Sequence, residues 1–237
     1  MSQPIPIYRH HHMMFYTVLL VILFFIFVLL FVAVSETAFQ AIGFTRGEFL
    51  LILLATLFGS FVNIPVYRSK KTKRVVEVEE VRAFWVTYRI PHVGLKEVST
   101  IIAVNLGGAV IPTLVSVYLI VSHVELLPEI LVSVILTSII VHLVARKVEG
   151  VGIVTPAFIP PIAAAIFALL LSRTDPAVVA YVSGSMGALI GADLTNLRGM
   201  GGMGESVASI GGAGTFDGVF LTGIIAVLIV TFLSMFH

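Results

Sequence analysis

Apolar residues gather along this chain in seven long runs, separated by short segments that contain charges or Pro and Gly. A helix of about 20 apolar residues crosses the hydrocarbon core of a bilayer, and Pro and Gly are typical of the boundaries between spans. We therefore predict an all-α polytopic membrane protein with about seven transmembrane helices, forming a single membrane domain over residues 1–237. The predicted spans cover residues 13–34, 48–64, 98–122, 127–145, 157–172, 176–197 and 215–236.

One polar stretch, residues 66–97, has a different pattern and lies between the second and third predicted spans. It combines β-branched and aromatic residues with alternating charge, as in Val75-Val-Glu-Val-Glu-Glu-Val81. This pattern favours strands, so we predict a small cytoplasmic β-hairpin insert. Its simplest role is a solvated cap over the helix ends, and the alternative is an edge that receives an extended substrate by strand addition.

Composition and charge agree with a membrane protein and suggest its orientation. The chain is 58% hydrophobic and 11% charged, with a mean hydropathy of +1.09, which is far from the composition of soluble domains. If the amino terminus is cytoplasmic, every Lys and Arg except Arg46 and Arg173 lies inside, as the positive-inside rule requires. We therefore predict the plasma membrane of a prokaryote, with the Gly-rich loop 198–214 cytoplasmic and the carboxyl terminus external.

The same composition bounds the ligands and partners. The chain contains no cysteine, which excludes disulfides, thiolate metal sites and cysteine nucleophiles. Its basic residues flank predicted spans and form no broad basic surface, so no nucleic acid partner is predicted. His10, His11 and His12 lack the spacing of a metal site, and we predict neither a metal nor a cofactor. The bilayer is the expected surrounding, and the oligomeric state is left open.

Two aspartates, Asp193 and Asp217, lie at facing ends of the sixth and seventh predicted spans, joined by the loop 198–214. Helices joined by a short loop are usually adjacent and antiparallel, so both carboxylates are expected at the same depth. Two carboxylates that share a proton can serve as base toward water and acid toward a carbonyl. The structural alternatives are an Asp193–Arg198 ion pair and a capping role for Asp217 at the start of its helix.

The sixth predicted span also carries small residues, Gly184, Gly187, Ala188 and Gly191, at spacings of three and four. Such residues let a neighbouring helix approach closely. Helical periodicity puts Asp193 nearly opposite Gly184. Helix packing and the candidate chemistry are therefore predicted on different faces.

Asn105 lies in the third predicted span, just before Gly107, Gly108 and Pro112. This pattern indicates an interrupted helix, which transporters use at substrate and ion sites. Asn105 is therefore a candidate to contact an aspartate or an ion. The alternative is an interhelical hydrogen bond to backbone that Pro112 leaves free.

Three further features lie near the predicted cytoplasmic side. Pro156, with Pro160 and Pro161, favours a kinked helix start. His142 is a candidate proton relay or an ordinary residue of the membrane interface. The glycines of the loop 198–214 predict a mobile backbone that could gate the site.

The segment around Asp193, the loop that follows it and Gly214-Thr-Phe-Asp217 resemble the paired catalytic segments of presenilin and signal peptide peptidase, the intramembrane aspartyl proteases. That family has Gly-x-Gly-Asp downstream and Tyr-Asp upstream, whereas this chain has Phe216 and Ala192 where the family has Gly and Tyr. The resemblance implies that Asp193 and Asp217 are catalytic. Pro156-Ala157-Phe158 resembles the Pro-Ala-Leu element that lies close to the active site in that family, although here it precedes the aspartates in the chain. Over most of its length the chain also resembles a prokaryotic membrane-protein family of unknown function, through residues 105–112, 191–196 and 211–218.

These observations support one leading hypothesis and two alternatives. The first is an intramembrane aspartyl protease that cleaves a membrane-embedded polypeptide. The second is an ion-coupled transporter or channel in which the same aspartates and Asn105 form an ion or proton site. The third is a non-catalytic scaffold or lipid-handling protein. In the first hypothesis Asp193 and Asp217 are catalytic, while substrate binding or gating is assigned to Gly214, Phe216, Gly218, Asn105 and Pro156.

Overall fold

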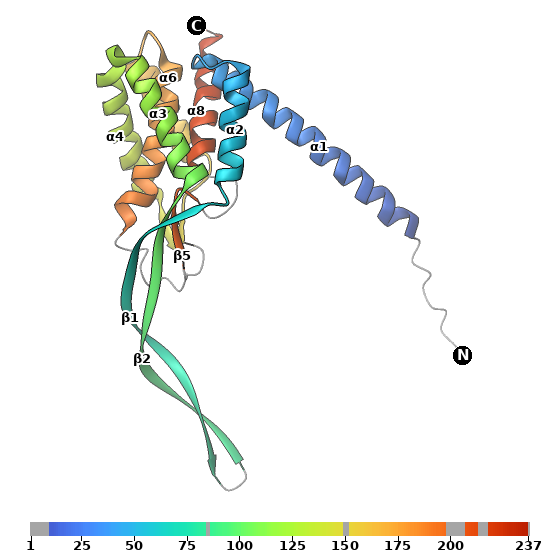
Figure 1. The fold of residues 1–237 in the computed structure, drawn as a ribbon, viewed down its shortest axis with the longest axis vertical. Coiled ribbons are helices and arrows are strands. Elements are labelled where there is room, and N and C mark those ends of the chain that lie inside the picture. Colours follow the sequence, from blue (N-terminus) through green and yellow to red (C-terminus); the bar gives the residue numbers. More distant parts are fainter. Residues whose placement is uncertain (1–9, 84–85, 149–151, 198–206, 213–217, 237) are drawn as a thin grey trace.

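The computed structural model describes residues 10–83, 86–148, 152–197, 207–212 and 218–236, with side chains for all of these except 10–13 and 71–98. Helices stand side by side in a bundle, a long hairpin leaves one end of it, and α1 slants away from it (Figure 1). We term the hairpin end the base of the bundle and the opposite end its top. The last helix, α8, runs from the base to the top.

The helices begin where the sequence supplies start signals. Thr45 and Glu48 form a reciprocal capping box at the start of α2, and Pro lies in the first turn of α3, α4, α5 and α6. The described α-helices are α1 (His10–Ala41), α2 (Arg46–Gly59), α3 (Ile111–Ser122), α4 (Leu127–Val144), α5 (Ile159–Leu171), α6 (Pro176–Ala188) and α8 (Gly218–Ser234).

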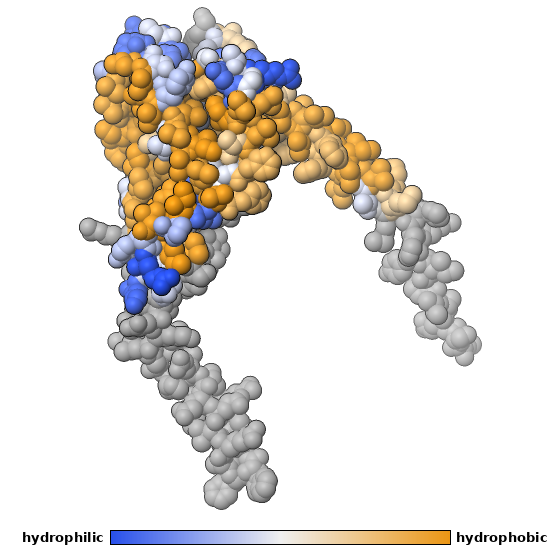
Figure 2. All heavy atoms as spheres, viewed as in Figure 1, coloured by the Kyte–Doolittle hydropathy of each residue, from blue (hydrophilic) through white to orange (hydrophobic). Residues whose placement is uncertain are grey.

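Among the described residues, three segments of helix are long and apolar enough to cross a membrane, and they cover Met14–Ala41, Val124–Val144 and Pro176–Asn196. Shorter apolar helices cover Leu106–Ser122, Ile159–Leu171 and Gly218–Ser234. Apolar residues form a belt over the face of the bundle seen in Figure 2, and hydrophilic residues gather at its top and base. Several apolar helices thus indicate insertion in a membrane, while the seven-span topology stays a prediction.

The β-hairpin is longer than the sequence pattern predicts. Strands β1 (Asn63–Ala83) and β2 (Val86–Asn105) pair in antiparallel register from Asn63↔Asn105 to Ala83↔Val86, with one irregularity between Pro65 and Tyr67. The prediction of helix for residues 98–105 is therefore wrong. This run is rich in β-branched residues, which favour strands. Its pairing with β1 therefore gives a strand, although its apolar composition is also compatible with a membrane helix.

The Gly-rich segment 198–214 contains a strand where a loop was predicted. Residues Val207–Ile210 form β5, which pairs in parallel with β2 from Ile101↔Val207 to Val104↔Ile210. The sheet order is therefore β1-β2-β5. A second, small pair joins β3 (Arg146–Val148) and β4 (Gly152–Val154) between α4 and α5.

Two clusters of buried residues form the core. The larger one surrounds the ring of Phe39, whose centroid lies 5.3–6.0 Å from the ring centroids of Phe44, Phe49, Tyr181 and Phe220. It joins the last turns of α1 to α2, α6 and α8. The smaller cluster fastens the sheet to the helices at the base, and it consists of Ile102, Ala109, Ala188, Leu189, Ala208, Ile210 and Val219.

The prediction that small residues of α6 permit close helix packing is confirmed. A Cβ atom on Gly184 would lie 3.1 Å from the carbonyl oxygen of Thr222 on α8. On Gly187 it would lie 2.6 Å from Thr137 of α4, and on Gly191 it would lie 2.5 Å from the carbonyl oxygen of Ser138. The helix backbones therefore approach more closely than any larger residue would allow.

Candidate functional site at the base of the bundle

Asp193 is the last residue of a π-turn, Leu189–Asp193, that continues α6 at the base. Such turns insert an extra residue into a helix and occur frequently at functional sites. The side chain is partly buried, and one carboxylate oxygen accepts a hydrogen bond of 2.6 Å from the backbone N–H of Gly211. Among the described residues no cation pairs with this carboxylate, so the Gly211 N–H is the group that stabilises it.

Gly211 is held in place by a conformation and a contact that only glycine allows. Its φ of +77° lies in the left-handed region, and a Cβ atom here would lie 2.5 Å from the Cβ atom of Ala109. Ala109 belongs to a second π-turn, Leu106–Val110, which leads into α3. The donor to Asp193 is thus fixed between β5 and the start of α3.

Asn105 joins the hairpin to the helices at this base. Its side-chain N–H groups donate to the carbonyl oxygen of Ser60 at 2.7 Å and to Oδ1 of Asn63 at 3.1 Å. Its own Oδ1 accepts from the backbone N–H of Gly108 at 2.8 Å and caps the turn. The sequence predicted that Asn105 lies in an interrupted helix, or that it bonds to a backbone group that Pro112 leaves free. Both predictions are wrong, because Asn105 ends strand β2 and caps the turn that leads into α3.

Gly107, two residues after Asn105, lies where the backbone of this turn meets the end of α2. A Cβ atom on Gly107 would lie 2.5 Å from the backbone nitrogen of Ser60 and 2.9 Å from the carbonyl carbon of Gly59. The end of α2 and the turn before α3 are therefore in backbone contact. The packing of Gly211 against Ala109 and the hydrogen bond from Gly211 to Asp193 bring the segments 105–112, 191–196 and 211–212 together at the base.

The sequence pattern does not mark two further residues of this network, Asn63 and Ser209. Oδ1 of Asn63 accepts a hydrogen bond of 2.6 Å from the hydroxyl of Ser209 on β5, as well as the bond from Asn105. Asn63 and Ser209 are 146 residues apart in the chain. Asn63 also falls inside an apolar run that predicts a span, so no local pattern marked this pair.

A second polar link lies beside Asp193. Thr195 donates its hydroxyl proton to the carbonyl oxygen of Gly191 at 2.7 Å, and Nδ1 of His142 lies 2.8 Å from the same hydroxyl oxygen. Asn196 donates to the carbonyl oxygen of Ala192 at 2.9 Å. The residues that follow Asp193 therefore satisfy the last carbonyls of this helix, and His142 ties them to α4.

Several predicted site residues lie outside the described part of the chain, namely Asp217, Gly214, Phe216 and Arg198. Gly218 is described and is the first residue of α8, with no atom within 4 Å of a Cβ atom built on it. Pro156 is exposed in the segment before α5, and its carbonyl oxygen accepts from the backbone N–H of Ile159 at 3.3 Å. The structure thus places Asp193 and Asn105 at the base and leaves the distance between the two aspartates open.

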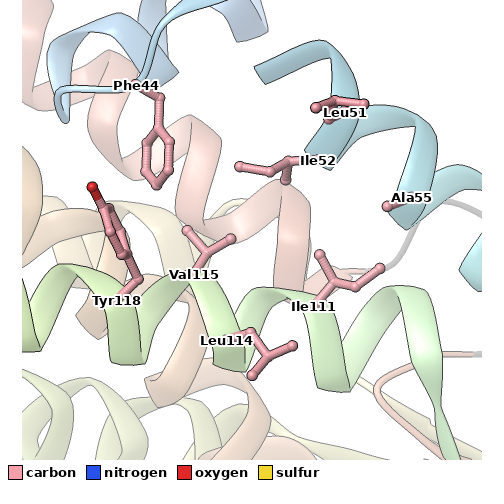
Figure 3. A pocket seen from close by; sticks show the side chains of 8 residues that line it. All are labelled: Phe44, Leu51, Ile52, Ala55, Ile111, Leu114, Val115 and Tyr118. Atoms are coloured by element: carbon pink, nitrogen blue, oxygen red, sulfur yellow. The ribbon is translucent and has the colours of Figure 1, made fainter. Parts of the chain in front are cut away.

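An apolar groove of about 340 Å³ lies elsewhere, between α2 and α3 (Figure 3). The rings of Phe44 and Tyr118, with centroids 5.3 Å apart, stand together at one end of it. Tyr118 is the one lining side chain with a polar atom, so the groove offers no convergent polar groups for chemistry. The remaining lining residues are Leu51, Ile52, Ala55, Ile111, Leu114 and Val115.

The fold is a helical membrane bundle with a small sheet at its base, where the polar contacts of Asp193 and Asn105 gather. A family model described as a protein of unknown function, DUF1614, matches residues 57–229. The match covers more than half of the chain, which therefore belongs to this family. No curated protein and no solved structure matches the chain. The likeness to presenilin and signal peptide peptidase accordingly rests on the motifs at Asp193 and Asp217 alone.

Proposed function

We propose that the protein is an intramembrane aspartyl endopeptidase in which Asp193 and Asp217 together activate water and protonate the scissile amide. The observation that carries this proposal is the environment of Asp193. Asp193 is a partly buried carboxylate at the end of a membrane-spanning helix and has no cationic partner among the described residues, a placement that favours a functional role over a purely structural one. Its one backbone donor, Gly211, belongs to the segment that leads to Asp217.

The surroundings of Asp193 support substrate entry at the base. Strand β5 is at the edge of the sheet and ends at Ile210, one residue before the donor to Asp193. An extended peptide can add to such an edge through main-chain hydrogen bonds. The expected substrate is a membrane-embedded polypeptide whose helix unwinds easily near the membrane surface, with Gly214, Phe216, Gly218, Asn105 and Pro156 as the proposed substrate-binding or gating residues.

The orientation of the protein is part of the proposal. Arg68, Lys70, Arg146 and Lys147 belong to the strands at the base, whereas Arg46 and Arg173 lie at helix ends near the top. We place the base in the cytoplasm of a prokaryote and the top outside, following the positive-inside rule. The chain has no cysteine, so a Lys70→Cys variant should react with an impermeant maleimide only after cells are permeabilised, and a Met235→Cys variant should react in intact cells.

The dyad is tested by reconstituting the protein into liposomes with membrane proteins of the producing cell and sequencing newly formed amino termini by mass spectrometry. Asp193→Asn and Asp217→Asn should each abolish the new termini, while the midpoint temperature of thermal unfolding stays as in the wild type. Asp175→Asn is the matched control, because Asp175 caps the other end of α6 through a bond of 3.2 Å from the Val178 N–H, which an Asn side-chain oxygen can also accept. Equal cleavage in wild type and either dyad variant would refute the proposal.

A further inference from the structure

The charges of the β-hairpin are divided along its length. Six basic residues and one acidic residue, Glu97, lie in the half next to the bundle, which comprises residues 68–74 of β1 and their partners 95–101 of β2. The outer half, residues 75–94, carries three Glu and two Arg. The hairpin is therefore strongly cationic only where it leaves the bundle. We term this inner half the basic band, and its basic residues are Arg68, Lys70, Lys71, Lys73, Arg74 and Lys96.

Cations without acidic partners are a general property of the base. Arg68 and Lys70 of the basic band are exposed, as are Arg146 and Lys147 on β3. Within the described part of the chain, none of these four side chains forms an ion pair. The base therefore attracts anions. Of the acidic residues with described side chains, only Asp193 lies at the base, and those near the top are Glu36, Glu48, Glu125, Glu129 and Asp175.

Strand pairing places two lysines of the basic band directly opposite each other. Lys73 and Lys96 are register partners, and like charges in such positions destabilise a pair of strands. Alternate residues of a strand share a face, so Lys71 belongs to the same face as this pair. Glu97 is the partner of Thr72 and belongs to the other face. No acidic residue of the basic band offsets the three lysines, whereas a bound anion would.

The basic band begins at the depth of the lipid headgroups. Helix α2 has 14 residues and extends about 21 Å, which is less than the hydrocarbon thickness of about 30 Å. The strand that follows α2 exposes Ile64, Val66 and Tyr67, and aromatic rings such as that of Tyr67 are typical of the membrane interface. From Asn63 to Arg68 the strand adds about 17 Å. Laid end to end, helix and strand cover about 38 Å, which reaches the headgroup layer of a bilayer about 40–45 Å thick.

We propose that the basic band binds the phosphate groups of anionic phospholipids in the membrane leaflet at the base. Clusters of four to eight Lys and Arg next to a membrane span are typical of such recognition, and the basic band has six. The phosphate oxygens accept hydrogen bonds from Lys ammonium and Arg guanidinium groups. A lipid is favoured over a soluble polyanion because the basic band directly follows an exposed apolar segment at the end of the bundle (Figure 1).

This binding fixes the hairpin at the membrane surface. Bound headgroups would offset the repulsion between Lys73 and Lys96 and hold the inner half of the hairpin beside the base. The outer half, with its mixed charges, then projects away from the lipid. The basic band includes neither Asp193 nor Asp217, so the proposal holds whether or not the protein is a peptidase.

The test uses the full-length protein in neutral detergent micelles, with an environment-sensitive dye on a Ser99→Cys variant. The chain has no natural cysteine, and Ser99 is exposed and is the register partner of Lys70. Phosphatidylglycerol is titrated into the micelles, and phosphatidylcholine serves as the neutral lipid. We expect a saturable change in fluorescence with phosphatidylglycerol alone, weakened about tenfold in about 0.5 M salt because salt screens exposed charges.

Two matched pairs of substitutions locate the binding surface. Arg68→Gln combined with Lys70→Gln should weaken the binding of phosphatidylglycerol by about tenfold or more, because each cation near anionic headgroups favours binding. Arg82→Gln combined with Arg89→Gln removes the same charge from the outer half and should retain the wild-type affinity. Arg68→Lys keeps the charge and should retain most of it. Circular dichroism verifies that each variant keeps its strands.

A further variant should bind lipid more tightly, which a misfolded protein would not do. Glu97→Gln removes the single acidic residue of the basic band, so phosphatidylglycerol should bind severalfold more tightly than to the wild type. Equal responses to the two lipids, or equal losses in the two double variants, would overturn the proposal. A response to inorganic phosphate or to a single-stranded oligonucleotide, without one to phosphatidylglycerol, would also overturn it.

Discussion

Helix α1 and the segment Pro176–Asn196, which consists of α6 and the turns that continue it, are both apolar and long enough to cross a membrane, but they have opposite surroundings. None of the most apolar 18-residue window of the first is buried inside the protein, compared with 72% for the second. The exposed part of α1 consists almost wholly of bulky Phe, Leu, Ile and Val, whereas α6 carries Gly184, Gly187 and Gly191. Hydropathy indicates that both belong in a membrane, and the small residues determine which one packs against protein.

The tilt of α1 agrees with this distinction. Its apolar segment of 28 residues would extend about 42 Å, compared with about 30 Å of hydrocarbon, and a longer helix is accommodated by tilting. Figure 1 shows α1 slanting away from the bundle. Lipid is therefore the expected neighbour of its amino-terminal part, and only its last turns belong to the folded core.

The largest expected change in stability distinguishes the buried end of α1 from its exposed part. Phe39→Ala should lower the free energy of unfolding by about 4 kcal/mol, since it empties the centre of the aromatic core. Phe25→Ala, on the same helix, removes a ring that is 61% exposed and should change stability by about 0.5 kcal/mol or less. Equilibrium unfolding in mixed micelles measures both, and equal losses would show that the exposed half of α1 packs against protein.

A smaller effect tests the contact between α6 and α4. Gly191→Ala should destabilise by about 3 kcal/mol, because the added methyl group meets the Ser138 carbonyl oxygen and Val141. Gly47→Ala on α2 has no atom within 4 Å of the new carbon and should be neutral or stabilise by up to about 1 kcal/mol. The same unfolding measurement applies, and a neutral Gly191→Ala would mean that the helices separate freely.

The smallest of these effects concerns the base. Asn105→Ala removes three hydrogen bonds from a buried position and should destabilise by about 2 kcal/mol. Ser209→Ala removes a single exposed bond and should lose about 1 kcal/mol or less. If the two variants lost the same amount, Asn105 would not be the residue that joins hairpin and helices.

The sequence predicted helical, membrane-type segments and a strand-forming insert, because apolar runs and β-branched alternation are local signals. It misplaced the boundary at residues 98–105, where an apolar run is equally compatible with a span and with a buried strand. Only the long-range pairing with β1 and β5 decides between these two structures. The short strand β5 was missed for the same reason, since its partner is distant in the chain.

The candidate site was predictable to a different extent. A carboxylate near the end of an apolar run marks Asp193 without any structural knowledge. The hydrogen bond from Gly211 to Asp193 and the nearby bond between Ser209 and Asn63 join segments that are far apart in the chain. These segments can approach one another because glycines leave room for close backbone contact. Local periodicity carries no information about such approaches. Whether the carboxylate of Asp217 faces Asp193 stays a prediction.

The parallel pairing of β2 with β5 also determines the order in which the protein can assemble. Ile101 and Val207 are partners although they are 106 residues apart, whereas β1 and β2 meet through a hairpin and can pair soon after synthesis. Because α3 to α6 lie between β2 and β5 in the chain, we expect them to be in place before β5 reaches the sheet. The bond from Gly211 to Asp193 is then expected to form late, after most of the bundle has been built.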